Sequence, residues 1–212
     1  MRAFPIPSHR IAVPILLAML SGCTGLAPRQ QAEQSWEQHQ AQLLELHDWT
    51  LRARIGLKRQ GEAASATLDW RQQQQDYQLL LIAPLGKGTV ELSARDGVVN
   101  LRTNDNQSFS ADSPEALLRQ HLGWHLPVDG LPYWIRGLPQ PGAPVDALIL
   151  DKRQRLIQLQ QSGWDISYGG YRQVADYVLP GKVRLEHNDI RIKLAVTEWT
   201  LENDDRLLAR PR

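Results

Sequence analysis

The sequence predicts a mainly β protein with helices, built on one antiparallel sheet of about 10–11 strands. Apolar and polar residues alternate with a period of two through most of residues 49–102, and the alternation returns between residues 147 and 201. Two stretches depart from it: residues 31–47 have helical spacing, and residues 113–144 are dense in Pro, Gly, Trp and Leu. A sheet with that many strands is expected to curl strongly or to close on itself.

The N-terminal residues 1–22 have the parts of a secretory signal peptide. Arg2 and Arg10 supply positive charge, an apolar run follows from Ile11 to Leu20, and small residues precede Cys23. The apolar run is about half the ~20 residues that a membrane-spanning helix needs. We therefore expect a cleaved signal, not a permanent transmembrane anchor.

The segment Leu20-Ser21-Gly22-Cys23 resembles the bacterial lipobox, in which the cysteine thiol is joined to diacylglycerol and becomes the first residue after cleavage. A chance cysteine beside an ordinary cleavage site is the alternative. Cys23 is the only cysteine, and an exported protein with one thiol cannot form an internal disulfide. We predict lipidation at Cys23, a tether over residues 23–30 and a single domain over residues 31–212. Thr24, where the lipobox family often has an inner-membrane Asp, implies the outer membrane.

The charge of the chain excludes one class of partner. Lys and Arg number 24 and Asp and Glu 23, well mixed along the sequence. Nucleic-acid-binding domains concentrate basic residues, so we expect no nucleic-acid partner.

The elements follow in order along the chain. After a helix between Gln31 and His47, strands are predicted at Trp49–Leu57, Ala64–Trp70, Tyr77–Ile82, Thr89–Ala94 and Val98–Arg102, with turns at Gln60-Gly61 and Asp96-Gly97. A short helix begins at Ser113-Pro114 and runs to about Leu122, with Ser as N-cap and Pro at the first position. A second short helix is expected near Leu131–Arg136. Strands return at Ala147–Asp151, Arg155–Gln161, Trp164–Tyr168, Gly181–Glu186 and Ile190–Thr197.

Three segments stand out by their motifs: Leu79–Gly86 (LLLIAPLG), Gly123–Pro139 (with GWHLP and LPYWIRGLP) and Gln161–Tyr168 (QSGWDISY). Together they resemble the LolB family of outer-membrane lipoprotein receptors. The resemblance covers nearly the whole chain after the lipobox. It implies an incomplete antiparallel β-barrel, lidded by short helices around an apolar cavity. It also implies that the protein takes acylated lipoproteins from the periplasmic carrier LolA and releases them into the outer membrane, on its periplasmic face, as a monomer and without nucleotide or other cofactor.

One face of the predicted strands would supply the surface for acyl chains, which gain about 0.8 kcal/mol per buried CH₂. The candidate cavity residues are Trp49, Leu51, Ile55, Leu68, Trp70, Leu79, Leu81, Val90, Leu92, Trp164 and Ile166. Periodicity does not distinguish a lined cavity from a packed core, so both interpretations stay open. The candidate lid residues are Trp124, Leu126, Leu131, Trp134, Ile135 and Leu138; a static plug over the barrel is the alternative.

The loop Pro84-Leu85-Gly86 joins two predicted strands and should place Leu85 at its tip. In the family, the corresponding loop protrudes with an exposed leucine that helps to deliver the lipoprotein into the membrane. A leucine folded back on the sheet is the alternative. The carrier would dock through Arg52 and Arg54 or through the acidic Glu62 and Asp69, and the sequence does not decide between them.

No motif for catalysis or metal binding appears. His39, His47, His121, His125 and His187 lack metal-ligand spacing with a third ligand, and no Gly-x-Ser-x-Gly or phosphate-binding loop is present. We therefore predict no enzyme and no metal. The competing hypotheses are a structural outer-membrane lipoprotein with a packed barrel and, less favoured, a periplasmic hydrolase.

Overall fold

The sheet contains eleven antiparallel strands in a computed structural model that describes residues 35–86, 88–122 and 126–201. Its strand order is β6-β5-β4-β3-β2-β1-β13-β12-β9-β8-β7. The N-terminal strands are β1 (Asp48–Arg59), β2 (Glu62–Gln73), β3 (Asp76–Ile82), β4 (Thr89–Arg95), β5 (Val98–Arg102) and β6 (Ser108–Ala111). The C-terminal strands are β7 (Val145–Leu150), β8 (Leu156–Gln161), β9 (Trp164–Gly169), β12 (Lys182–His187) and β13 (Ile190–Leu201).

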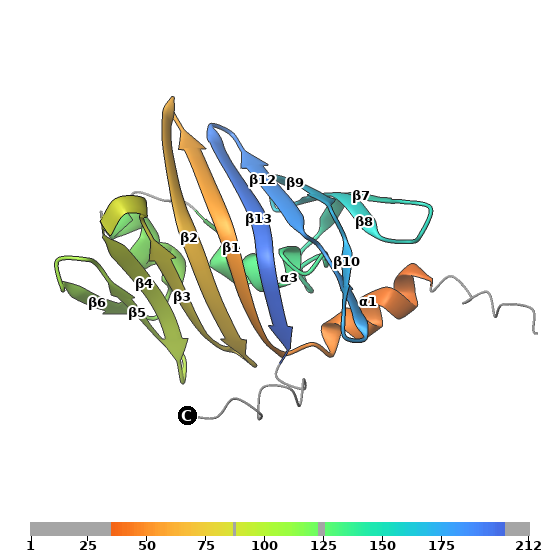
Figure 1. The fold of residues 1–212 in the computed structure, drawn as a ribbon, viewed down its shortest axis with the longest axis horizontal. Helices are drawn as coiled ribbons and strands as arrows, with labels where there is room; N and C mark the ends of the chain where they lie inside the picture. The colour runs from red at the N-terminus through yellow and green to blue at the C-terminus, as the bar shows by residue number, and fades with distance from the viewer. Residues whose placement is uncertain (1–34, 87, 123–125, 202–212) are drawn as a thin grey trace, which may run out of the picture. The chain divides into compact units, whose positions relative to one another are not determined.

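This order confirms the predicted incomplete barrel. β1 pairs with β13, which joins the two halves of the chain at the middle of the sheet, while β6 and β7 form two separate edges. The predicted turns are also present: Gln60 and Gly61 have φ of 49° and 87°, and Asp96 and Gly97 have φ of 52° and 79°. Two consecutive left-handed residues match the right-handed twist of the strands they connect. Figure 1 views the outer face, with β1 and β13 near the centre and α3 behind them.

The helices lie within the three segments for which the sequence predicts them. They are α1 (Trp36–Leu44), α2 (Pro114–Leu117), which continues into the π-helical turn η2 (Leu118–Leu122), and α3 (Leu131–Trp134), which follows the 3₁₀ turn η3 (Val128–Gly130). Ser35 caps α1 in a capping box with Gln38, and Ser113 caps α2 through the amide of Ala116. Among the described residues, no helix has the length and apolar character needed to cross a membrane.

Three strands were not predicted. β6 is short, and the separate hairpin of β10 (Arg172–Val174) and β11 (Tyr177–Leu179) has only three residues in each strand. Such lengths are too short to show a period of two. The hairpin contacts α1, since the Gln42 side chain donates to the carbonyl of Asp176 at 2.8 Å.

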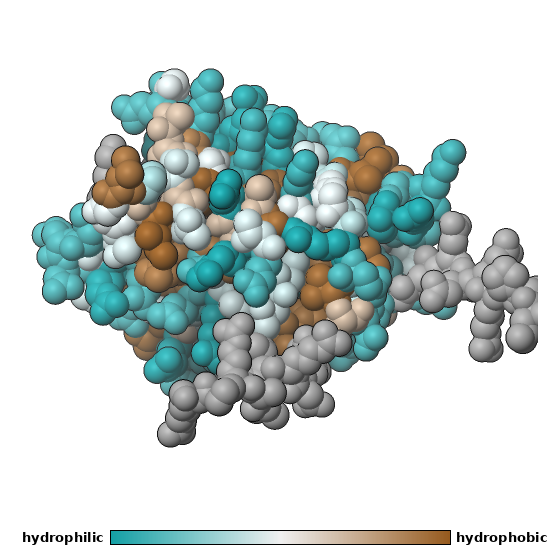
Figure 2. Space-filling model, in the orientation of Figure 1, coloured by the Kyte–Doolittle hydropathy of each residue, from teal (hydrophilic) through white to brown (hydrophobic). Residues whose placement is uncertain are grey.

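The outer face of the sheet is mostly hydrophilic, with separate apolar patches (Figure 2). The inner face forms the main core together with α1 and α3, and a smaller core lies between β4, β5 and α2. The predicted signal peptide, the tether and Cys23 lie outside the described residues.

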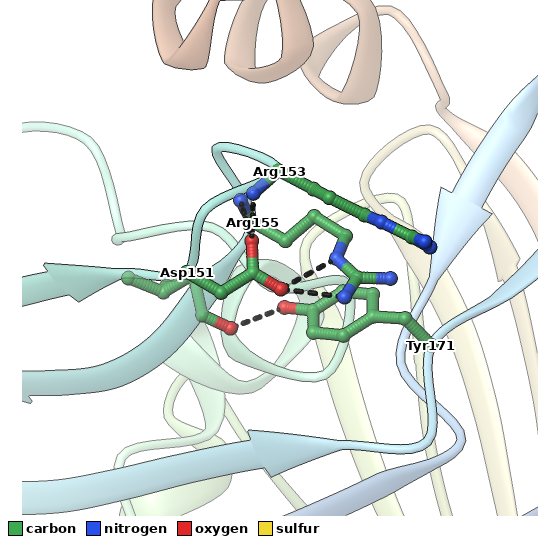
Figure 3. A network of polar contacts seen from close by, with 5 residues as sticks. Asp151, Arg153, Arg155 and Tyr171 are labelled. Carbon is green, nitrogen blue, oxygen red and sulfur yellow. Dashed lines mark hydrogen bonds and ion pairs between the residues drawn. The ribbon is translucent and has the colours of Figure 1, made fainter. Parts of the chain in front are cut away.

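A polar network fixes the turn between β7 and β8 (Figure 3). The Asp151 carboxylate accepts from the backbone amides of Arg153 and Arg155, at 2.8 and 3.0 Å, and from Nε of Arg155 at 2.8 Å. The Arg155 guanidinium lies 5.0 Å from the centre of the Tyr171 ring, whose hydroxyl donates to the carbonyl of Leu156 at 2.6 Å. These contacts hold the β7–β8 turn and the start of β8 against the segment that follows β9.

Candidate functional site

The inner face of β1 changes from fully covered to half-covered along a single strand. Trp49, Leu51 and Ala53 are at most 1% exposed, whereas Ile55 and Leu57 on the same face are only partly buried. A strand in an ordinary sandwich would keep its inward side chains covered along its length. The sheet therefore leaves an apolar surface without a complete cover at the end near the β1–β2 turn.

An apolar cavity of about 90 Å³ lies beneath this part of the sheet. Its walls come from the inner faces of β1–β4, β12 and β13 and from the helical segments across from them, and no polar surface lines it. The lining residues are Ile55, Leu68, Trp70, Leu79, Leu81, Val90, Leu92, Leu118, Leu126, Val128, Leu131, Ile135, Leu185, Ile192 and Leu194.

A second hollow of about 240 Å³ continues the first. The two share Ile55, Leu81, Val90, Leu126 and Ile192. The remaining walls are mostly small residues near the β3–β4 loop, among them Ala64, Ala66, Ala83 and Gly88. Small side chains keep this end open, so it has the form of a mouth leading into the cavity.

Seven of the eleven predicted cavity residues line this space: Ile55, Leu68, Trp70, Leu79, Leu81, Val90 and Leu92. The other four, Trp49, Leu51, Trp164 and Ile166, lie in the packed core and are at most 4% exposed. The physical reason is the cover above them. α3 and the residues after it seal this end of the sheet, with the ring centres of Trp134 and Trp164 6.2 Å apart.

The predicted lid divides in the same way. Leu126, Leu131 and Ile135 line the cavity, while Trp134 and Leu138 are fully buried in the core. Trp124 lies outside the described residues. Sequence reasoning missed Leu118 and Val128 of the helical segments and Leu185, Ile192 and Leu194 of β12 and β13. The alternation of apolar and polar residues within 190–201 is sufficient to predict Ile192 and Leu194 as inward-facing.

α3 is held in place by buried polar bonds. The indole of Trp134 donates to Oε1 of the fully buried Gln161 at 2.8 Å. The Arg136 guanidinium donates to the carbonyls of Leu43 and Leu46 at the end of α1, and burial lowers the pKa of Arg136 to about 10. The segment predicted as a lid is thus fixed at α3, and its partly buried residues are Leu126 and Leu131.

Leu85 is the most exposed large apolar residue among the described residues, at 94%. It lies in the 3₁₀ turn η1 (Pro84–Gly86) and has left-handed φ and ψ of 58° and 31°. The carbonyl of Gly88 accepts from the amide of Ala83 at 2.9 Å and closes the loop at its base. The loop therefore presents Leu85 to solvent beside the mouth.

Three of the described histidines, His39, His121 and His187, pack against neighbouring aromatic rings, and His47 is exposed. His39 is 6% exposed, and burial, with Arg155 nearby, lowers its pKa. His121 stacks on Phe109 and His187 on Trp164. No group of three or more His, Cys, Asp or Glu with metal-binding geometry occurs in the described part of the chain. His125 is outside that part.

An incomplete barrel with an apolar cavity and a protruding leucine loop agrees with the resemblance found in the sequence. The family model described as outer membrane lipoprotein LolB matches residues 47–199. This chain belongs to the LolB family.

Relatives named outer-membrane lipoprotein LolB extend the match. The protein from Nitrosococcus oceani is 40% identical over 188 residues, which are 87% of this chain and 94% of the relative. The protein from Pseudomonas paraeruginosa is also 40% identical, over 86% of this chain and 91% of its own length. LolB membership supports a role in outer-membrane lipoprotein localisation and not an enzymatic one.

Solved structures share the fold. A putative outer membrane lipoprotein-sorting protein domain from Vibrio parahaemolyticus has a TM-score of 0.53 at 10% identity, covering 81% of this chain and 94% of its own. A LolA superfamily protein from Nitrosomonas europaea has a TM-score of 0.50 at 7% identity, over 82% and 98%. At such identities the likeness concerns the fold alone.

Proposed function

We propose that this LolB-family protein receives acylated lipoproteins from the carrier LolA, binds their acyl chains in the cavity and inserts them into the outer membrane. The observation that carries the proposal is the incomplete cover of the inner face, where Ile55, Leu79 and Leu81 remain partly exposed in an otherwise apolar space. An acyl chain is the ligand that needs such a surface, because it gains about 0.8 kcal/mol per buried CH₂ and offers few groups for polar recognition.

The size of the cavity indicates how an acyl chain would enter. An apolar cavity of about 150 Å³ holds one benzene ring, so the cavity of about 90 Å³ is too small for a long acyl chain. The mouth of about 240 Å³ adds room for part of one chain. Entry would therefore displace Leu126 and Leu131, which are partly buried, and leave the anchored Trp134 in place.

Transfer without nucleotide requires affinity to increase at each step, from the carrier to this protein and then to the bilayer. A difference of ~1.4 kcal/mol per step gives a tenfold preference. Acyl chains on Cys23 would hold the domain at the periplasmic face of the outer membrane. The exposed Leu85 would then enter the apolar layer beside the mouth at the moment of release.

Site-specific photo-crosslinking tests the cavity directly. A photoreactive amino acid at Leu81, which lines both the cavity and its mouth, should crosslink to the acyl chains of a client delivered by LolA. Leu159 is the matched control, because it is fully buried in the core and lines neither space. Crosslinking at neither position, together with failure to displace a fluorescent fatty acid, would instead favour a structural lipoprotein with a packed barrel.

A further inference from the structure

The outer face of the sheet carries a groove whose walls are basic. Its volume is about 480 Å³, and its floor consists of small residues, Gly56, Gly169 and Ala195. Four cations surround that floor: Arg54, Lys182, Arg184 and Lys193. All four are exposed, and each alternates along its strand with an inward-facing residue, so they lie on the face of the sheet opposite to the apolar cavity. This outer face is mostly hydrophilic (Figure 2).

Strand register brings these residues together. Arg54 of β1 is paired with Ala195 of β13, which is paired with Lys182 of β12. The adjacent row on the same face pairs Gly56 with Lys193 and Lys193 with Arg184. Ala195 thus lies between Arg54 and Lys182, and Gly56 lies beside Lys193. These small residues leave room for a compact ligand between the long basic side chains.

The positive charge of this groove is largely uncompensated. Among the described residues, no ion pair joins Arg54, Lys182 or Lys193 to a carboxylate. Arg184 lies 3.8 Å from Glu186, but that carboxylate is bound by Arg191 at 2.6 Å. The chain as a whole has a net charge of only +1, so the groove is a local concentration of charge.

The groove leads towards the leucine loop. The row of Arg54 continues through Thr67 of β2 to Ile82 of β3, which is 36% exposed. A shallow hollow of about 330 Å³ connects Arg54 with Ile82 and Pro84 along this row. The outer face therefore passes from cations to exposed apolar side chains over three strands and ends at the loop that carries Leu85.

We propose that the basic groove binds the phosphate groups of anionic membrane lipids while Leu85 is inserted beside them. This inference rests on the proposed release of clients into a membrane. A polybasic patch strengthens membrane binding when it accompanies a weak apolar insertion, because each basic residue near an anionic surface adds about 1 kcal/mol. The adjoining exposed Ile82 and Leu85 favour a lipid surface, because apolar side chains beside cations match the acyl layer and the anionic headgroups together.

The test uses the full lipidated chain in vesicles of phosphatidylethanolamine, alone or with a minor fraction of phosphatidylglycerol. With Cys23 acylated, Ser65→Cys provides one free thiol for a fluorophore next to Gly56, its partner in β1. Quenching by a headgroup-labelled lipid measures the ratio of docked to undocked protein. The test variant is Lys182→Gln with Lys193→Gln, and the control variant changes two exposed cations outside the groove, Arg95→Gln with Lys152→Gln.

We expect docking only in the phosphatidylglycerol vesicles. A Lys or Arg near an anionic surface contributes about fivefold, so the test variant should lower the docked ratio by about 25-fold while the control variant leaves it unchanged. Replacement of the same two lysines by arginine should retain docking. Ionic strength near 1 M, where the Debye length is about 3 Å, should abolish docking.

Several results would overturn the inference. The first two are equal docking to both kinds of vesicle and an equal loss of docking in the control variant. The others are displacement of the docked protein by free phosphate without any preference for phosphatidylglycerol, and a test variant that is defective only in accepting clients from LolA. The last would assign the groove to the carrier. Crosslinking from Leu81 separates the two proposals: intact crosslinking without lipid-dependent docking refutes the groove alone, whereas docking without crosslinking refutes the acyl cavity.

Discussion

Replacement of Leu85 separates the release of a client from the stability of the fold. Because the side chain is 94% exposed, its loss removes almost no buried surface. Its left-handed φ of 58° costs an L residue about 1–2 kcal/mol, a strain that glycine does not have. After the greater chain entropy of glycine is subtracted, Leu85→Gly should raise the free energy of unfolding by roughly 0.5–1 kcal/mol.

The same change should impair insertion. Moving one leucine side chain from water into an apolar layer gains about 1.5–3 kcal/mol, which corresponds to roughly 10–150-fold in the inserted fraction. Leu85→Gly should lose that factor, and Leu85→Glu should lose more, because a carboxylate must also be desolvated. Neither variant changes the cavity walls, so acceptance of clients from LolA should be unaffected.

The assay follows one labelled client through both steps, from LolA to the protein and from the protein to vesicles. Urea denaturation of the same variants supplies the free energy of unfolding. We expect Leu85→Gly to be at least as stable as the parent protein and defective only in the second step. Equal loss of both steps, or release that is unaffected in both variants, would refute the assignment of Leu85 to membrane insertion.

Three further changes test the surroundings of the site. Gln161→Leu should lower the free energy of unfolding by about 3–5 kcal/mol in urea denaturation, because it leaves the indole of Trp134 and the amide of Gln140 without their acceptor, now 2.8 Å from each; a loss below 1 kcal/mol would contradict this. Gly88→Ala should lower the free energy of unfolding by about 2 kcal/mol and slow release of the client, because φ at this position is +130° and the new Cβ would lie 2.7 Å from the Asn104 side chain. An unchanged melting temperature and release rate would exclude this strain. Partial desolvation, with the nearby Glu115, raises the pKa of the Asp129 carboxyl although its side chain is exposed, so the ionised carboxylate opposes folding. Asp129→Asn should therefore raise the free energy of unfolding at neutral pH in urea denaturation, and this gain should decline as pH falls through the raised pKa and vanish below the ordinary pKa of an aspartate, whereas a gain that grows in acid would contradict the assignment.

The sequence predicts the strands well wherever the pattern is long. β1 and β13 each contain twelve residues, and their alternating burial matches the alternation of residue types. Tight turns with left-handed residues, such as Asp96-Gly97, set the register between neighbours. Strands of three or four residues carry too little pattern, and β6, β10 and β11 were missed for this reason.

The division of the inner face into core and cavity was not predictable from the strands themselves. Trp49 and Ile55 belong to the same strand and point to the same side, yet one is sealed and the other lines the cavity. The difference arises from the placement of α3, which depends on long-range contacts. Arg136 reaches carbonyls about ninety residues earlier in the chain, and Trp134 binds Gln161 of β8. No local sequence pattern predicts such long-range contacts.

This division would allow one sheet to be stable and also to bind the proposed ligand. A binding surface that stays partly uncovered without its ligand contributes less to stability than a packed core. Here the sealed end compensates, because the Trp49 ring packs against the rings of Trp70 and Trp199, at centre distances of 5.2 and 5.4 Å. The open end can therefore keep small residues and partly exposed leucines at its mouth. Since a ligand that fills this end covers an apolar surface the protein already displays, binding should require little change beyond displacement of Leu126 and Leu131.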